Sequence, residues 1–310
     1  RSLSNFFIAS RNGCVMTKDK DRFLNIILVS PSIVAVLIFV YGFIAWSVRV
    51  SLSKWKGLNP DYTWNSINNY IGLFNDPRFA VDVKNTLIFT GVFVLGSLLL
   101  GFFLAVMLDQ GLRGEGFFRS LFLFPMAISY IVTGVVWRWL MNPAMGSRMS
   151  GFNLLFTNLG LDSLVNAWHT TPQWGMAAIA LAAIWQMSGY TMALYLAGLR
   201  AIPQELKEAA RIDGASEAQI YRHIMIPLLA PVTLSALIIL GHMSLKVFDL
   251  IVAIAGKQLQ LDVPASYMWQ ATFDGLFYGR GAAIGIILLL SVAILIIPYI
   301  RYTLRTEAQQ

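Results

Sequence analysis

The stretch EAARIDGASEAQIYRHIMIP occupies residues 208–227 and is flanked by strongly apolar sequence. It is rich in charge, although only 13% of the chain is Asp, Glu, Lys or Arg. Pro203 suits the first turn of a helix, and good helix formers follow it. Gly214 can end that helix in the left-handed conformation, and Ser216 with Gln219 forms a capping box that begins a second helix. The stretch therefore predicts a polar helix, a tight turn and another helix.

The surroundings of this stretch are too apolar for a soluble protein. The chain has 310 residues, of which 57% are hydrophobic, and its mean hydropathy is +0.64. A soluble domain cannot bury that much apolar surface, whereas runs of about 20 apolar residues are long enough to cross a bilayer as helices. We predict an all-α polytopic membrane protein with six transmembrane helices, over residues 24–49, 86–108, 119–140, 177–198, 228–254 and 281–301.

The basic residues indicate how these helices are oriented. An even number of spans puts both termini on one side of the membrane. Loops on that side hold thirteen Lys and Arg residues, against seven in the alternate loops. The positive-inside rule then places the termini and residues 201–227 in the cytoplasm. The net charge of +7 is explained by these membrane flanks, so it does not indicate nucleic-acid binding.

This orientation divides the chain into three parts. Residues 1–23 are a cytoplasmic segment, residues 24–301 are the transmembrane domain with the polar block 201–227, and residues 302–310 are a cytoplasmic tail. The sequence begins with Arg1, and Met16 precedes the first apolar run, so we expect residues 1–15 to be non-native. Cys14 is the single cysteine, which excludes an internal disulfide.

The polar block has the properties of a docking surface. Ala209, Ala210 and Gly214 are small enough to let another backbone approach, while Glu205 and Glu208 offer charges. Asp213 offers a further carboxylate beside the turn. From these residues alone, a surface loop that contacts no partner is an equally good interpretation.

The spacing of the block resembles a known motif. Glu208-Ala209-Ala210, three residues, Gly214, nine residues, Ile224, one residue and Ile226-Pro227 resemble the EAA motif of ABC importer permeases, with Ile226 in place of the usual Leu. Residues 69–70, 76–79, 85–87, 118–120, 137–140, 196–199 and 248–250 are similar to segments of carbohydrate-type (maltose-type) permeases. The resemblance covers most of the chain.

This resemblance implies a permease subunit of an ATP-driven sugar importer in a prokaryotic inner membrane. The block would be a coupling helix seated on an ATPase, with Glu208 as its charged anchor and Gly214 as its turn. The implied coupling residues are Glu205, Glu208, Ala209, Ala210, Asp213, Gly214, Ile224 and Pro227. The implied partners are a second, different permease, two ATPase subunits and an external sugar-binding protein.

The chain lacks the motifs of an enzyme. Its Gly256-Lys257 pair has no upstream glycine at the P-loop position, so ATP and Mg²⁺ are expected on the partner ATPases. His169, His223 and His242 have no metal-ligand spacing. We therefore expect no cofactor or metal on this chain, and a transport subunit in place of an enzyme.

A sugar path requires polar groups for hydroxyls and aromatic faces for sugar rings. Side chains of these kinds lie within the predicted spans, where polar groups usually face a bundle interior or a wet cavity. The candidates are Tyr130, Thr133 and Trp137 in the third span, Trp185, Gln186, Ser188 and Tyr190 in the fourth, and Ser235, His242 and Asp249 in the fifth. For each of them, a hydrogen bond between helices is the structural alternative.

Other interpretations remain open at this stage. Lys246 and Asp249 are spaced i, i+3, as in a helical ion pair, or they would form the relay of an ion-coupled secondary transporter of a small polar solute. A non-transporting scaffold is a third possibility. Gly281, Ala282 and Gly285 suggest close helix packing or are chance small residues. The sugar is undetermined, with residues 248–285 weakly similar to glucose/mannose-type permeases.

Overall fold

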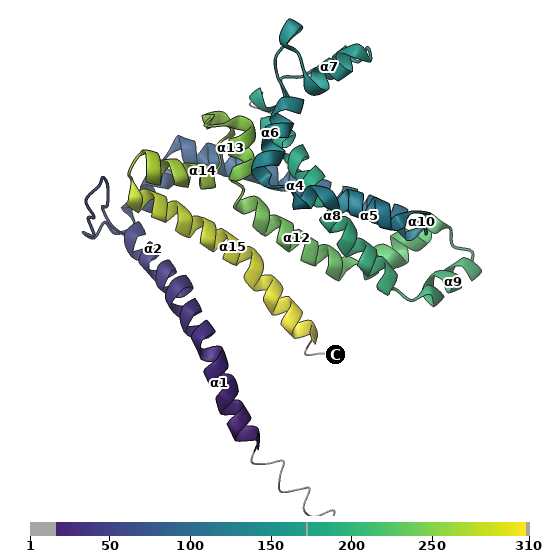
Figure 1. The fold of residues 1–310 in the computed structure, drawn as a ribbon, viewed down its shortest axis with the longest axis horizontal. Helices are drawn as coiled ribbons and strands as arrows, with labels where there is room; N and C mark the ends of the chain where they lie inside the picture. Colours follow the sequence, from purple (N-terminus) through teal and green to yellow (C-terminus); the bar gives the residue numbers. More distant parts are fainter. Residues whose placement is uncertain (1–16, 172, 308–310) are drawn as a thin grey trace, which may run out of the picture.

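The computed structural model describes residues 17–171 and 173–307, so the expectations for residues 1–16 and 308–310, Cys14 and Met16 included, lie outside the described chain. The described residues form helices joined by loops, and a single β-bridge between Ser53 and Trp64 is the one strand-like pairing among them. Figure 1 shows this arrangement. The predicted all-α class is confirmed.

The N-terminal helices form an arm that projects from the rest of the molecule (Figure 1). It consists of α1 (Thr17–Val36), a π-helical turn and α2 (Phe43–Ser51). None of its most apolar 18-residue window is buried. Because exposing so much apolar surface to water is unfavourable, this arm requires lipid or another apolar surface around it.

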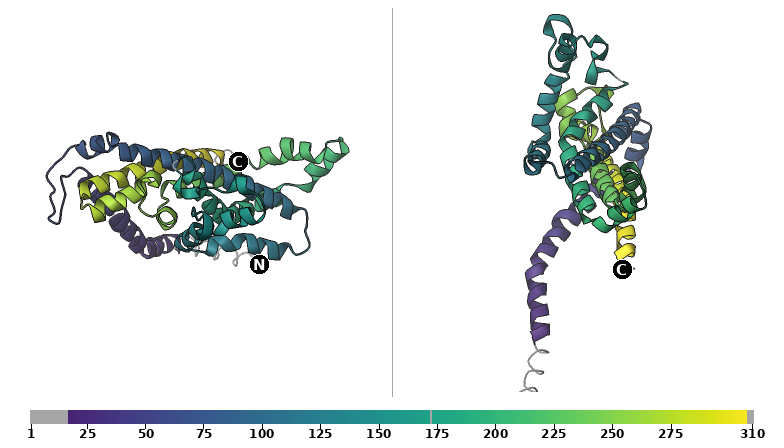
Figure 2. Two further views of the ribbon diagram at one scale, coloured as in Figure 1. Left: turned by 90° about the horizontal axis from the view of Figure 1, so that it is seen from above. Right: turned by 90° about the vertical axis from the view of Figure 1, so that its right-hand side faces the viewer.

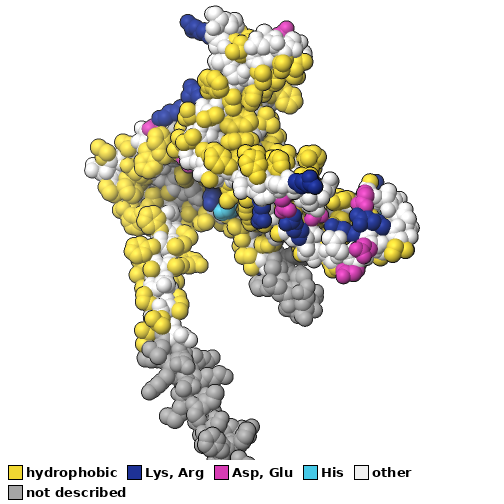
Figure 3. Space-filling model, turned by 45° about the vertical axis from the view of Figure 1, so that its right-hand side comes forward, with side chains coloured by type: hydrophobic (Ala, Val, Ile, Leu, Met, Phe, Trp, Pro, Cys, Tyr) yellow, Lys and Arg dark blue, Asp and Glu magenta, His cyan; other side chains and the backbone are white. Residues whose placement is uncertain are grey.

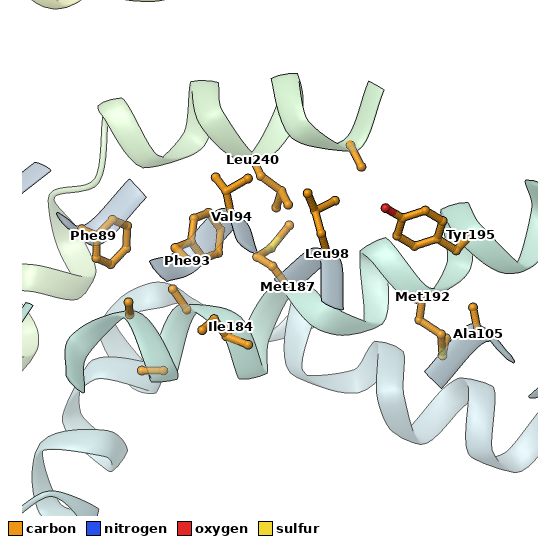
Figure 4. Close-up of a cluster of buried hydrophobic side chains, with 14 of the residues drawn as sticks. Phe89, Phe93, Val94, Leu98, Ala105, Ile184, Met187, Met192, Tyr195 and Leu240 are labelled. Carbon is orange, nitrogen blue, oxygen red and sulfur yellow. The ribbon is translucent and has the colours of Figure 1, made fainter. Parts of the chain in front are cut away.

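The centre of the fold is the packing of α4 (Pro77–Asp109) against α8 (Gly175–Ala201). Figure 4 shows Phe89, Phe93, Val94 and Leu98 of α4 interleaved with Ile184, Met187 and Met192 of α8, with Leu240 covering them from α12. A Cβ at Gly101 would lie 2.0 Å from the Thr191 hydroxyl oxygen, so glycine is required for this approach.

Two spans predicted as single helices are broken, which corrects the sequence analysis. Residues 119–140 divide into α5 (Glu115–Leu123), a 3-10 turn that contains Pro125, and α6 (Tyr130–Leu140), and the chain bends by 98° between them. Ser129 caps α6 by accepting a hydrogen bond from the Val132 N–H. Residues 228–254 divide into α12 (Ala230–Leu245) and α13 (Asp249–Ala255).

The number of spans agrees with the prediction when each of two bent helix pairs is counted as one span. Four described helices are long and apolar enough to cross a membrane, and there are six if each bent pair is one span. The second bent pair is formed by residues 217–228 and α12, which meet at 63°. The chain is therefore a multi-pass membrane protein.

The last helix, α15 (Tyr278–Glu307), packs along α2, α12 and α14 (Pro264–Trp269). A Cβ at Gly281 would lie 1.9 Å from the Thr272 hydroxyl oxygen, and Gly285 faces the Met268 sulfur. The close packing suggested by these small residues is confirmed.

Short helices occupy the loops: α3 (Asn68–Phe74), α7 (Gly151–Asn158), α9 (Gln204–Ile212), α10 (Glu217–Ile220) and α11 (Ile226–Leu228). Figures 1 and 2 show α7 in a lobe above the bundle and α9 with α10 at the end farthest from α14.

A polar network fastens the start of α4 to the segment around α14. Arg78 pairs with Asp262, donates to the Gln270 side chain over 2.7 Å and lies 4.1 Å from the Tyr267 ring centre. The Tyr267 hydroxyl donates to Asp76 over 2.7 Å. This network gives residues 76–79 a structural role.

We predict that Asp262→Asn lowers the free energy of unfolding by about 3 kcal/mol, because it removes one partner of a largely desolvated pair. The Asp262 side chain is 4% exposed and that of Arg78 is 26% exposed. Thermal unfolding in nanodiscs measures the effect. The matched control is Asp274→Asn, since the Lys257–Asp274 pair is 59% and 47% exposed and such pairs contribute about 1 kcal/mol or less. Equal shifts for the two variants would contradict the structural role of the network.

Candidate coupling surface and translocation path

The polar block folds as the sequence predicts. Pro203 stands at the N-cap of α9, one position before the first helical residue. Gly214 has φ +80°, and its N–H donates to the Arg211 carbonyl while the Ala215 N–H donates to that of Ala210. The predicted capping box of Ser216 and Gln219 is present at the start of α10. The helix, glycine turn and second helix are confirmed as local structure.

The exposed side of this hairpin forms a surface that we call the coupling surface. It comprises Glu205, Leu206, Glu208, Ala209, Ile212, Asp213 and Gly214. Charged side chains gather at this end of the molecule, in contrast to the largely hydrophobic remainder of the visible face (Figure 3). Ile212 is 86% exposed and was not predicted as part of this surface. Its position at the helix end, among polar residues, could have indicated its exposure.

Three motif residues lie away from the coupling surface. Ala210 is buried on the inner side of α9. Ile224 is half-buried against the main core, and Pro227 lies in the first turn of α11. The motif therefore combines an exposed part with a part that anchors the hairpin to the bundle.

A cavity of about 240 Å³ lies where α12 and α13 separate. We call it the path cavity, and its aromatic and polar lining residues are Phe89, Phe93, Tyr130, Ser244, Lys246, Phe248 and Asp249. Of the predicted path residues, Tyr130 and Asp249 are brought together here. Lys246 was considered together with Asp249 in the fifth span, whereas Phe89, Phe93, Ser244 and Phe248 were missed as path candidates, although residues 248–250 stood out in the sequence.

The break between α12 and α13 overturns two details of the sequence analysis. Lys246 caps α12, Phe248 has φ −138° and ψ −63°, and Asp249 begins a new helix. Lys246 and Asp249, both in the described chain, form no ion pair, because an i, i+3 spacing joins side chains only within one continuous helix. The fifth-span candidates are divided by the same break, with Ser235 and His242 on α12 and Asp249 on α13.

The fourth-span candidates do not gather around one cavity. The Gln186 amide donates to the Ile128 carbonyl over 2.6 Å, and the Ser188 hydroxyl donates to the Trp185 carbonyl. Tyr190 packs against the main core. Trp185 lies 6.0 Å from Trp137 between ring centres. Gln186 therefore links α8 to the turn before α6, and the Ser188 hydroxyl is bonded within α8.

The remaining candidates occupy separate places. Thr133 is buried in α6, the helix that packs on α13. The Ser235 hydroxyl lies 3.0 Å from the Tyr299 hydroxyl and links α12 to α15. His242 lines a second cavity of about 540 Å³, beside Lys246 and Trp269. Within the described ranges, no three His, Cys, Asp or Glu side chains are grouped to hold a metal.

Known proteins share this sequence and architecture. Residues 97–305 match the family described as "Binding-protein-dependent transport system inner membrane component". A crystal structure of a bacterial ABC transporter that imports the acidic polysaccharide alginate contains a chain with the same fold, with a TM-score of 0.75 and 23% identity over 93% of this chain and 98% of that one.

Curated relatives match along nearly the whole chain. A probable ABC transporter permease protein of Pyrococcus horikoshii is 40% identical, over 94% of this chain and 99% of its own. The xylose/arabinose import permease protein XacH of Haloferax volcanii is 35% identical, over 86% and 83%. The trehalose/maltose transport system permease protein MalF of Thermococcus litoralis is 31% identical, over 92% and 95%.

These similarities favour the importer permease over the ion-coupled transporter, and they identify a transport component in place of an enzyme. Such a component lies in the inner membrane and works with an ATPase and a substrate-binding protein. Since the family match extends over more than half of the chain, the protein belongs to the binding-protein-dependent transport system inner membrane components, the permease subunits of ABC importers.

Proposed function

We propose that this chain is one of two different permease subunits of an ATP-driven sugar importer. The observation that carries the proposal is the pairing of an exposed coupling surface at one end of the bundle with an aromatic and polar path cavity at a helix break. The names of relatives that import xylose, arabinose, trehalose and maltose support a sugar as the cargo.

The coupling surface has the properties of a transient docking site. Glu205 and Glu208 supply charge on exposed helix faces, and Leu206 and Ile212 supply apolar contact area at 43% and 86% exposure. An ATPase cleft that covers these residues would bury the apolar side chains and select the orientation through the charges. This docking and the count of basic residues support a cytoplasmic location for α9, α10 and both termini.

The path cavity has the chemistry of a carbohydrate site. Phe248 is half-buried and offers a ring face to the apolar side of a sugar, while Phe89 and Phe93 form part of the buried wall behind it. The Lys246 ammonium can donate and the Asp249 carboxylate can accept hydrogen bonds from sugar hydroxyls, and the two side chains are not paired with each other. About 240 Å³ is below the usual size of a small-molecule pocket, so a second permease is needed to complete the site.

The assembly is tested by purifying the chain from native membranes and determining its partners by native mass spectrometry. We expect one copy of this chain, one copy of a different permease and two copies of an ATPase. A complex that transports sugar with this chain as its sole permease would contradict the proposed pairing.

For the coupling surface, we predict that Gly214→Val impairs coupling more than Glu208→Gln does. A valine in the left-handed turn costs roughly 1–2 kcal/mol before any clash with a partner, whereas an exposed charged contact contributes about 1 kcal/mol or less. The measurements are ATPase co-purification and sugar uptake per ATP hydrolysed.

Gly57→Val is the matched control, since Gly57 has φ +85° in a different loop and, like Gly214, has open space around its Cβ position. It should carry the same strain and keep coupling. If Gly214→Val and Glu208→Gln both couple hydrolysis to uptake like the parent, the hairpin is not the coupling element.

For the path cavity, we predict that Asp249→Ala and Phe248→Ala reduce uptake about 10-fold or more, because they remove an acceptor and a stacking face. Gln186→Ala should instead lower the yield of assembled complex, because Gln186 holds the Ile128 carbonyl. Asp61→Asn, in the loop before α3, is the control for a lost carboxylate. Normal uptake by both cavity variants would show that the path cavity is not the sugar site.

A further inference from the structure

The α9–α10 hairpin meets the transmembrane helices at a charged junction that the motif does not include. Its outer face is exposed, but Lys207 on the inner face of α9 is buried. The Lys207 ammonium lies 3.3 Å from the Asp109 carboxylate at the last residue of α4. These two side chains are 11% and 13% exposed, so they are the most shielded ion pair at this end of the described chain.

Asp109 also connects α4 to neighbouring helices. Arg200, near the end of α8, lies 3.8 Å from Asp109 and 2.8 Å from Glu115 at the start of α5. A carboxylate at a helix C-terminus interacts unfavourably with the negative end of the helix dipole. The charges of Lys207 and Arg200 offset this cost. Asp109 therefore joins the hairpin to the central α4–α8 pair.

The pair is the charged link between α9 and the end of α4, and it lies beside a cavity. A cavity of about 390 Å³ separates the hairpin from the end of α4, and Asp109, Lys207, Tyr221 and Met225 contribute to its walls. Ala210, Ile220 and Met225 share a buried core with Leu108 of α4, and beside this apolar packing Lys207 is the charged contact through which a displacement of α9 reaches Asp109. Near its middle α4 holds Phe89 and Phe93 at the path cavity.

We infer that Lys207 and Asp109 are positioning residues that transmit the motion of the coupling surface to α4 and so to the path cavity. The inference rests on the proposed function, because it requires an ATPase that moves the hairpin. It assigns a role to two residues outside the motif spacing. It also distinguishes docking, carried by the outer face of α9, from transmission, carried by the inner face.

The test separates transmission from assembly. In the full complex in nanodiscs, with Cys14→Ser and Val247→Cys, maleimide labelling of the new cysteine reports the path cavity without requiring a known sugar. In the parent, labelling should differ between the nucleotide-free and ATP–vanadate states. In Lys207→Gln and in Asp109→Asn, this difference should fall about 5-fold or more, the lower range of an allosteric coupling.

Three comparisons show whether the pair acts as a unit. Lys207→Arg keeps the charge and should retain most of the labelling difference. The double variant Lys207→Gln with Asp109→Asn should lose no more than Asp109→Asn alone, as expected for residues in one interaction. Asp274→Asn, which breaks the exposed Lys257–Asp274 pair elsewhere, should behave like the parent.

The outcomes distinguish the inference from the function on which it rests. ATPase co-purification should remain at the parent's value in Lys207→Gln, and the complex should stay folded with a lowered melting temperature, because one partner of a shielded pair is removed. A variant that labels like the parent overturns the inference alone. A variant that loses the ATPase or the fold, without rescue by Lys207→Arg, overturns it in favour of a structural role. A parent complex without an ATPase or a nucleotide-driven change overturns the proposed function as well.

Discussion

The close packing of α4 on α8 is the constraint on which the rest of the structure depends. In a bilayer, apolar side chains gain little from leaving lipid, so helices associate where small residues let their surfaces interlock. Gly101 admits Thr191, whose hydroxyl donates to the Ser97 carbonyl over 2.8 Å. On the next face of α8, a Cβ at Gly189 would lie 2.0 Å from the Phe122 carbonyl oxygen, so the broken third span also depends on this helix. The path cavity and both polar networks attach to this pair.

The hairpin could be predicted from sequence because its structure is local. Gly214, Ser216 and Gln219 define the turn and cap within a few residues, and neither feature requires a distant neighbour. The exposed or buried state of each motif residue could not be predicted in the same way. Ala209 and Ala210 are adjacent and chemically identical, yet one is exposed and the other faces the core, which is decided by where α9 meets the bundle.

The path cavity was largely beyond prediction because its cause is tertiary. Residues 246–248 contain no proline or glycine that would mark the break. The sequence is apolar on both sides of it, so hydropathy predicts one continuous span. The chain leaves helical geometry there while α13 packs on α6 and α12 packs on α4. An irregular backbone at membrane depth is tolerated where protein or a wet cavity covers it. The break, and the separation of Lys246 from Asp249, therefore follow from the neighbours of the segment.

The two ends of α4 differ in a way that suits a relay. At its start, Arg78 and Asp76 are held by several groups from the segment around α14, which fixes this end firmly. At its end, Asp109 contacts the single cationic groups of Lys207 and Arg200 at 3.3 and 3.8 Å beside a cavity, which leaves room for adjustment. A helix of 33 residues extends about 50 Å, enough to cross the membrane and both interfaces. Because α4 is one continuous helix, a displacement of Asp109 is carried along it to Phe89 and Phe93, which line the path cavity near its middle.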